Sequence, residues 1–152
     1  GMDMVDVRSV LTQMIDMIIH NMVDRDRHIV INLTCDSFTL FSRQATSLIL
    51  IINELVHNAL EHAFVSRDRG IINIEVKQEC NEILLVVADN GIGFNKQDLN
   101  KSNSLGLNII RTLVEEDLKG IINIIGQRGT KVEVKFPFFL AEEVCYADYS
   151  GG

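Results

Sequence analysis

The sequence predicts an α/β (α+β) two-layer sandwich, in which helices pack on one face of a mixed β-sheet. Segments with helical spacing of apolar residues are mixed with pairs of alternating segments that form hairpins, and few strand–helix–strand crossovers occur. The 152 residues fit one domain with a full hydrophobic core. A hydrophobic content of 47% and one proline exclude a disordered or low-complexity chain.

Three helices follow from the spacing of apolar residues. The first is expected from about Asp6 to Met22, and a short strand follows at Ile29 to Leu33. The second is expected from about Ser42, as its N-cap, to Phe64. The third is expected from Leu105 to Leu118, with Gly120 as the glycine after its C-terminus.

Two hairpins supply the remaining strands. The segment 72–76 alternates apolar and polar residues, the turn 79–81 follows, and the segment 83–88 indicates a buried partner strand. The segments 121–125 and 131–136 form the second hairpin around the turn 126–129.

Charge and composition limit the function. The 14 basic and 21 acidic residues give a net charge of −7, which argues against non-specific binding of nucleic acid or an anionic membrane. No secretory signal is present, and the longest apolar run, 47–56, is too short to span a bilayer. The three cysteines are widely spaced, with no near pair at metal-ligand spacing. We therefore expect a cytoplasmic protein that does not itself insert into a membrane.

The second expected helix carries polar residues on the arc opposite its apolar face. Glu54, Asn58, Glu61 and His62 stack there at spacings of three and four. A carboxylate and an amide oxygen on one arc can reach a single ligand or metal ion. A solvated helix face is the alternative explanation.

Three short glycine-containing segments follow in order. Asp89 to Phe94 comes after an apolar strand, and its paired glycines let the backbone approach a ligand closely. Ser104 to Leu107 opens the third helix, where free N–H groups attract anions. Gly129 and Thr130 come third. An ordinary turn, an N-cap and a hairpin turn are the respective alternatives.

Together these segments resemble the Bergerat ATP-binding fold of histidine kinases, DNA gyrase and mismatch-repair ATPases. Asn53 to Phe64 is similar to the N box, Asp89 to Phe94 to the first glycine box, and Ser104 to Leu107 to the second. Gly129 with Thr130 is similar to the third motif. The amino-acid sequence of these motifs is most similar to that of histidine kinases with a short ATP lid, the HWE-like and related sensor kinases. The resemblance covers about residues 5 to 138.

The resemblance implies a role for each matching residue. Asn58 would coordinate Mg²⁺ that bridges the ATP phosphates, and Glu54 would be the polarising or general-base residue. Asp89 would bind the adenine amino group, and His62 would lie near the phosphates. The other implied cofactor-binding residues are Gly91, Gly93, Ser104, Leu105, Gly106, Leu107 and Thr130. The sequence departs from the family at Glu61, where relatives often have a basic residue, and in a short lid at 95–103.

The resemblance implies the ATP-binding catalytic domain of a two-component sensor histidine kinase. It would pass the γ-phosphoryl group to a histidine on a separate dimerisation domain, from which a response regulator receives it. His20 lacks the neighbours of a phosphoacceptor box, so we expect that histidine outside this chain. Residues 1–140, including the helix within 1–24, would form the ATP-binding domain, and 141–152 an acidic tail. A stand-alone serine kinase of the anti-sigma-factor type and a non-catalytic nucleotide-sensing module are the alternatives.

Overall fold

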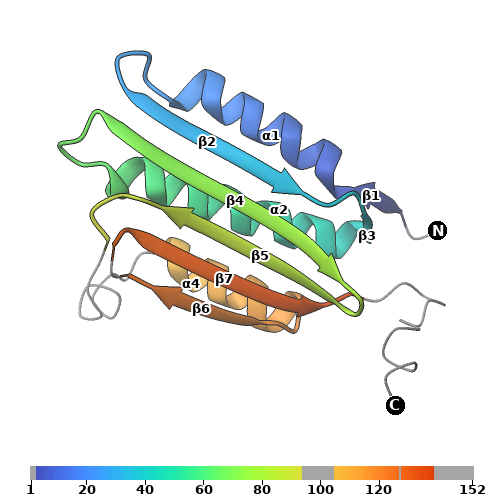
Figure 1. The fold of residues 1–152 in the computed structure, drawn as a ribbon. Helices are drawn as coiled ribbons and strands as arrows, with labels where there is room; N and C mark the ends of the chain where they lie inside the picture. The colour runs from blue at the N-terminus through green and yellow to red at the C-terminus, as the bar shows by residue number, and fades with distance from the viewer. Residues whose placement is uncertain (1–2, 94–104, 127, 139–152) are drawn as a thin grey trace.

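A computed structural model describes residues 3–93, 105–126 and 128–138. In this part of the chain, five strands form one mixed sheet (Figure 1). In their order across the sheet they are β2 (His28–Cys35), β4 (Arg69–Glu79), β5 (Glu82–Asp89), β7 (Thr130–Pro137) and β6 (Ile121–Ile125). β2 and β4 pair in parallel, and every other neighbouring pair is antiparallel. The predicted mixed sheet and both hairpins are confirmed.

The helices pack on one face of this sheet, as the sequence predicts (Figure 1). They are α1 (Val7–Met22), α2 (Ser42–Asn58) and α4 (Leu105–Thr112). The π-helical turn η1 (Ala59–Ala63) continues α2, and the π-helical turn η2 (Leu113–Asp117) continues α4. Among the described residues, no helix has the length and apolar character needed to cross a bilayer.

A small second sheet lies at the N-termini of α1 and α2. It pairs β1 (Met4–Asp6) with β3 (Thr39–Phe41) in an antiparallel manner. Asp6 caps α1 as its Oδ1 accepts a hydrogen bond from the Ser9 amide at 3.2 Å. The prediction that Ser42 caps α2 is wrong: Phe41 is the N-cap, and the Ser42 amide donates to the Asp3 carbonyl at 2.9 Å. β3 therefore replaces a side-chain cap at this helix end.

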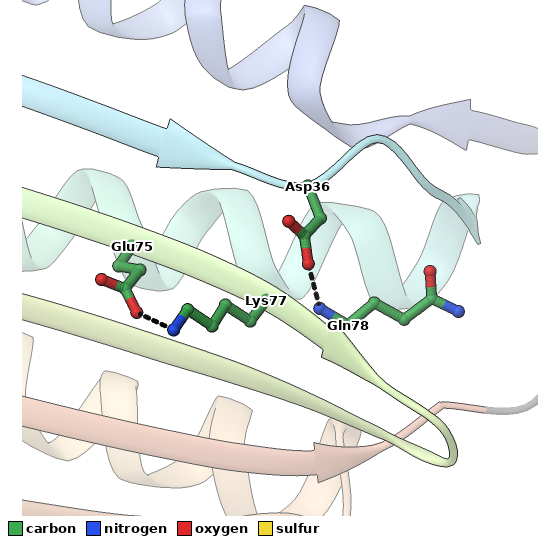
Figure 2. A network of polar contacts seen from close by, with 4 residues as sticks. All are labelled: Asp36, Glu75, Lys77 and Gln78. Carbon is green, nitrogen blue, oxygen red and sulfur yellow. Dashed lines mark hydrogen bonds and ion pairs between the residues drawn. The ribbon is translucent and has the colours of Figure 1, made fainter. Parts of the chain in front are cut away.

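The core lies between the helices and the inner face of the sheet. Every second residue is buried there from Gly70 to Val76 in β4 and from Ile83 to Val87 in β5, which follows from the period of two along a strand. The outer face carries ion pairs, among them Lys77 Nζ to Glu75 Oε1 at 3.0 Å (Figure 2). Beyond the end of β2, Asp36 Oδ2 accepts a hydrogen bond from the Gln78 amide at 2.9 Å, which extends the contact between β2 and β4 (Figure 2).

Gly120 separates η2 from β6, but not in the way the sequence predicts. The residue with left-handed backbone is Lys119, at φ 55°. A Cβ on Gly120 would collide with the Lys135 carbonyl oxygen and lie 2.8 Å from the Phe136 Cβ. Gly120 is therefore needed because β7 passes close to its backbone, and not because of a left-handed helix end.

Candidate functional site

Four chain segments that are far apart in the sequence end or begin at one edge of the molecule. The C-terminal end of α2 with η1, the end of β5, the start of β7 and the start of α4 lie together there (Figure 1). The N box and the third motif lie within the described residues in full, the first glycine box is described up to Gly93, and the second from Leu105 onward. The directions in which these four segments run therefore bring the predicted site residues together at the carboxyl end of β5.

Glu54 and Asn58 lie one turn apart on α2, and both are half-buried. They face Gly106 of α4: a methyl group built on Gly106 would lie 3.1 Å from Glu54 Oε2 and 3.8 Å from both amide atoms of Asn58. The N box and the second glycine box therefore lie side by side at these three residues, with little space for a side chain on Gly106. The buried residues of the opposite arc pack on the core, as predicted; they are Ile52, Leu55, Val56, Ala59 and Ala63.

Asp89 is the last residue of β5, and its carboxylate is held by the backbone. Its Oδ1 accepts hydrogen bonds from the Gly91 amide at 2.9 Å and from the Thr130 amide at 3.3 Å. Burial raises the pKa of Asp89, and these two hydrogen bonds lower it in part. Within the described part of the chain both bonds go to Oδ1, which leaves Oδ2 to accept a hydrogen bond from a ligand.

The Asp89 loop, defined here as Asp89–Gly93, packs directly on η1. The Ile92 amide donates to the Ala63 carbonyl at 2.8 Å. A Cβ on Gly91 would collide with that same carbonyl oxygen and lie 2.6 Å from the Ala63 Cβ. Gly91 is therefore a glycine because the first glycine box and the end of the N box touch along the backbone.

The third motif closes the other side of the Asp89 loop. Gly129 has φ 90°, and a Cβ there would collide with the Asp89 carbonyl oxygen. Gly93 has φ 72°, with a Cβ position 3.0 Å from the Gly129 carbonyl oxygen. The first and third motifs thus depend on glycine at two facing positions, and the Thr130 amide then reaches Asp89.

The other predicted residues are less closely tied to this cluster. Glu61 and His62 point into solvent, with side chains 62% and 75% exposed, and His62 Nε2 lies 3.6 Å from Glu61 Oε2. Leu107 is half-buried on α4. Leu105 is the first described residue of α4, whereas Ser104 and the lid at 95–103 lie outside the described residues.

Sequence reasoning missed two arginines beside the cluster, Arg27 and Arg67. Arg27 precedes β2, and its Nη2 donates to the Phe64 carbonyl at 2.6 Å and the Arg67 carbonyl at 2.9 Å. Arg67 Nη1 donates to the Asn90 carbonyl at 3.1 Å. These bonds end on main-chain oxygens, which every residue type provides, so the sequence carries no pattern that would reveal them.

The donors in the cluster suit Mg²⁺ held jointly with a nucleotide. Among the described residues, no group of three or more His, Cys, Asp or Glu side chains could hold a metal ion. Glu54 and Asn58 nevertheless offer a carboxylate and an amide oxygen around Gly106. Mg²⁺ takes hard oxygen ligands and usually binds through one or two protein groups with water and substrate phosphates. The residues present therefore fit this ion.

The family described as "Histidine kinase-, DNA gyrase B-, and HSP90-like ATPase" matches residues 43–140. This chain belongs to that ATPase family. The match begins with α2 and includes all four motifs. The predicted family is confirmed.

Relatives of this ATPase domain include named sensor histidine kinases. "Sensor histidine kinase PdtaS" of Mycobacterium tuberculosis is 40% identical over 140 residues, which is 88% of this chain and 28% of that protein. "Blue-light-activated histidine kinase 2" of Erythrobacter litoralis is 31% identical over 120 residues, 77% of this chain and 34% of that protein. The chain therefore spans only about a third or less of these relatives.

Solved structures agree with the fold of this ATPase domain. The histidine kinase domain of a blue-light activated histidine kinase from Erythrobacter litoralis superposes with a TM-score of 0.80 at 25% identity. The superposition covers 88% of this chain and 62% of that one. The mycobacterial sensor histidine kinase MprB gives a TM-score of 0.71 at 17% identity, which bears on the fold alone.

Proposed function

We propose that this chain is the ATP-binding catalytic domain of a two-component sensor histidine kinase. It would transfer the ATP γ-phosphoryl group to a histidine on a separate dimerisation domain, and a response regulator would then receive it. The observation that carries the proposal is the close approach of Glu54 and Asn58 to Gly106, at the same edge as the fixed carboxylate of Asp89. Family membership and the sensor-kinase names of the relatives support it.

Adenine recognition falls to the Asp89 loop. Asp89 Oδ2 would accept a hydrogen bond from the exocyclic amine, because Oδ1 is already occupied by the amides of Gly91 and Thr130. Gly91 and Gly93 would let the loop backbone approach the base and ribose, because they allow the loop to pack closely on Ala63 and Gly129. Thr130 fixes the carboxylate from the side of β7.

The triphosphate would lie between α2 and α4. The backbone N–H groups of Leu105 to Leu107 lie at the start of α4, which is the positive end of the helix dipole. They would therefore favour binding of an anion. Asn58 would hold Mg²⁺, which supplies charge neutralisation to the phosphates when bound. Glu54 would accept a hydrogen bond from the attacking group and so orient it. Because the acidic chain meets the anion through backbone donors and a cation, its net charge of −7 is compatible with ATP.

The remaining expected features belong to the same proposal. His62 and Ser104 would lie near the phosphates. Residues 1–140 would form the domain, 141–152 a tail, and the protein would act in the cytoplasm. Glu61, which departs from the family pattern, has a solvent-exposed carboxylate beside His62, so it need not face the phosphates.

The test is calorimetric titration of this chain with Mg-ATP, with the variant Asn58→Asp. We expect binding by the wild type and a loss of about 100-fold in the variant, because a carboxylate replaces the neutral amide beside the phosphates. Asn21→Asp is the matched control, since Asn21 is an exposed residue in the last turn of α1 and undergoes the same charge change. Absence of ATP binding, or equal affinity in the two variants, would refute the proposal.

Phosphotransfer is the second half of the test. The chain is mixed with a phosphoacceptor domain of a related sensor histidine kinase and γ-labelled ATP, and acid-labile label on histidine is measured. We expect transfer by the wild type and none by Asn58→Asp. Label that appears on serine instead would support the anti-sigma-factor type of kinase.

A further inference from the structure

Two arginines outside the four motifs connect the Asp89 loop to the end of the N-box helix. Arg27 lies between α1 and β2, and Arg67 lies between η1 and β4. Neither residue belongs to the ATP site proposed above. Both donate hydrogen bonds to carbonyl oxygens of backbone that borders that site.

The first contact lies at the C-terminal end of η1. The last carbonyls of a helix lack partners within the helix. Arg27 Nη2 donates to the Phe64 carbonyl at 2.6 Å, and the Arg67 amide donates to the same oxygen at 3.1 Å. The positive guanidinium also lies at the negative end of the helix dipole, where a cation is stabilising.

Arg27 also fixes the turn that follows. The same Nη2 atom donates to the Arg67 carbonyl at 2.9 Å, and the His28 amide donates to the Asp68 carbonyl at 2.6 Å. In this turn Ser66 has φ 63°, a strained value for a residue other than glycine. Arg27, which is half-buried, therefore holds together both ends of a turn that has an unfavourable backbone conformation.

Arg67 carries this arrangement to the Asp89 loop. Its Nη1 donates to the Asn90 carbonyl at 3.1 Å. Asn90 is held from the other side by Ile71, whose amide donates to Asn90 Oδ1 at 2.8 Å and whose carbonyl accepts from the Asn90 amide at 3.2 Å. Asn90 lies between Asp89 and Gly91, whose amide donates to Asp89 Oδ1, so the bonds that hold Asn90 restrain the backbone on both sides of it.

We infer that Arg27 and Arg67 are positioning residues, which hold the Asp89 loop in the geometry that distinguishes adenine from other bases. The inference rests on the proposed function, because it assigns adenine recognition to Asp89. Neither arginine touches the nucleotide in this scheme. Arg67 acts through Asn90, and Arg27 acts through the backbone of 64–67.

The test compares binding of ATP with binding of inosine triphosphate (ITP), which has an oxygen in place of the exocyclic amine. We expect Arg67→Ala to weaken ATP binding about threefold and Arg27→Ala about tenfold, since the latter loses two hydrogen bonds from a charged donor. Binding of ITP should change by less than about twofold in both, because it lacks the amine that Asp89 binds. A role in stability alone would weaken binding of both nucleotides equally.

Matched controls are available beside each arginine. Arg25→Ala lies in the same loop as Arg27, and Arg69→Ala lies two residues beyond Arg67; both residues are exposed. Neither control should change the ratio of ATP to ITP affinity. Arg67→Lys keeps one donor on a long side chain and should recover part of the lost ratio. Thermal unfolding without nucleotide establishes that each variant is folded during titration.

Combination with Asp89→Asn separates this inference from the proposed function. If the arginines act through Asp89, adding Arg27→Ala to Asp89→Asn should weaken ATP binding by less than about twofold. Normal ATP selectivity in Arg27→Ala and Arg67→Ala, or additive losses in the double variant, would overturn the inference while wild-type ATP binding stands. If Asp89→Asn itself leaves the ratio unchanged, the adenine assignment fails, and this inference with it.

Discussion

Replacing Gly91 by alanine tests how tightly the first glycine box must pack on the N box. The new Cβ would lie 2.6 Å from the Ala63 Cβ and would collide with the Ala63 carbonyl oxygen. Non-bonded carbon atoms normally approach to about 3.5–4.0 Å, so the loop must move by about 1 Å. The positive-φ glycines in the described chain are Gly93 and Gly129, so the cost at Gly91 comes from this contact and not from its backbone angle.

The cost has two parts. Overpacking costs about 1–3 kcal/mol, and loss of the hydrogen bond from the Ile92 amide to the Ala63 carbonyl adds about 1 kcal/mol. We therefore expect Gly91→Ala to lower the free energy of unfolding by about 2–4 kcal/mol. The moved loop also displaces the Gly91 amide from Asp89 Oδ1. Since a hydrogen bond to a charged group is worth about 1.5 kcal/mol or more, we expect ATP affinity to fall by about tenfold or more.

Gly120→Ala is the matched control for this variant. A Cβ on Gly120 would likewise collide with a carbonyl oxygen, that of Lys135. Gly120 precedes β6, which starts opposite Lys135, whereas Asp89 pairs with Thr130 at the other end of β7. Urea unfolding should show similar destabilisation of both variants, whereas titration with Mg-ATP on the folded proteins should show lost affinity only for Gly91→Ala. Equal ATP affinities, or an unchanged free energy of unfolding in Gly91→Ala, would refute the packing argument.

Two further predictions concern a pKa and a buried hydroxyl. Burial raises the pKa of Asp89 above its ordinary value of 3.8, so the folded chain keeps a proton that the unfolded chain has lost. The free energy of unfolding of the wild type relative to Asp89→Asn should therefore fall as the pH rises between 3.8 and the raised pKa, measured by urea unfolding; a constant difference would contradict this. Ser47 is 4% exposed, and its Oγ lies 3.2 Å from Asp117 Oδ2, joining α2 to η2. Ser47→Ala should cost about 1 kcal/mol, whereas Thr46→Ala, which loses an exposed bond within α2, should cost less than about 0.5 kcal/mol; equal losses would argue against the α2–η2 link.

The sequence predicts the elements of this fold wherever an apolar pattern is long enough to have a period. α1 and the two hairpins each carry at least two repeats of their pattern. β1 and β3 have three residues each, too few for alternation to be visible, so the sequence misses both. Missing β3 also explains the error at Ser42, because a strand occupies the place of the expected cap.

The candidate site likewise contains residues that the sequence reveals and residues that it does not reveal. Asp89, Asn58 and Gly106 are recognisable because their residue types are required by local geometry or by the proposed chemistry. Arg27 and Arg67 are not recognisable, because they meet the site through main-chain oxygens and Arg27 reaches across 37 and 40 residues of sequence. Short-range patterns reveal which groups form a site, whereas the contacts that hold those groups depend on the complete fold.

The π-helical turn at the end of α2 explains why one polar arc of the sequence becomes two groups in space. A regular α-helix would stack Glu61 and His62 on Asn58, and a carboxylate would then face the phosphates. In η1 the hydrogen bonds span five residues instead of four, which widens the turn directly after Asn58. Glu54 and Asn58 stay half-buried beside Gly106, whereas Glu61 and His62 are exposed. The same turn ends at Ala63, whose carbonyl accepts the hydrogen bond of the Ile92 amide, so this change of helix type also anchors the Asp89 loop.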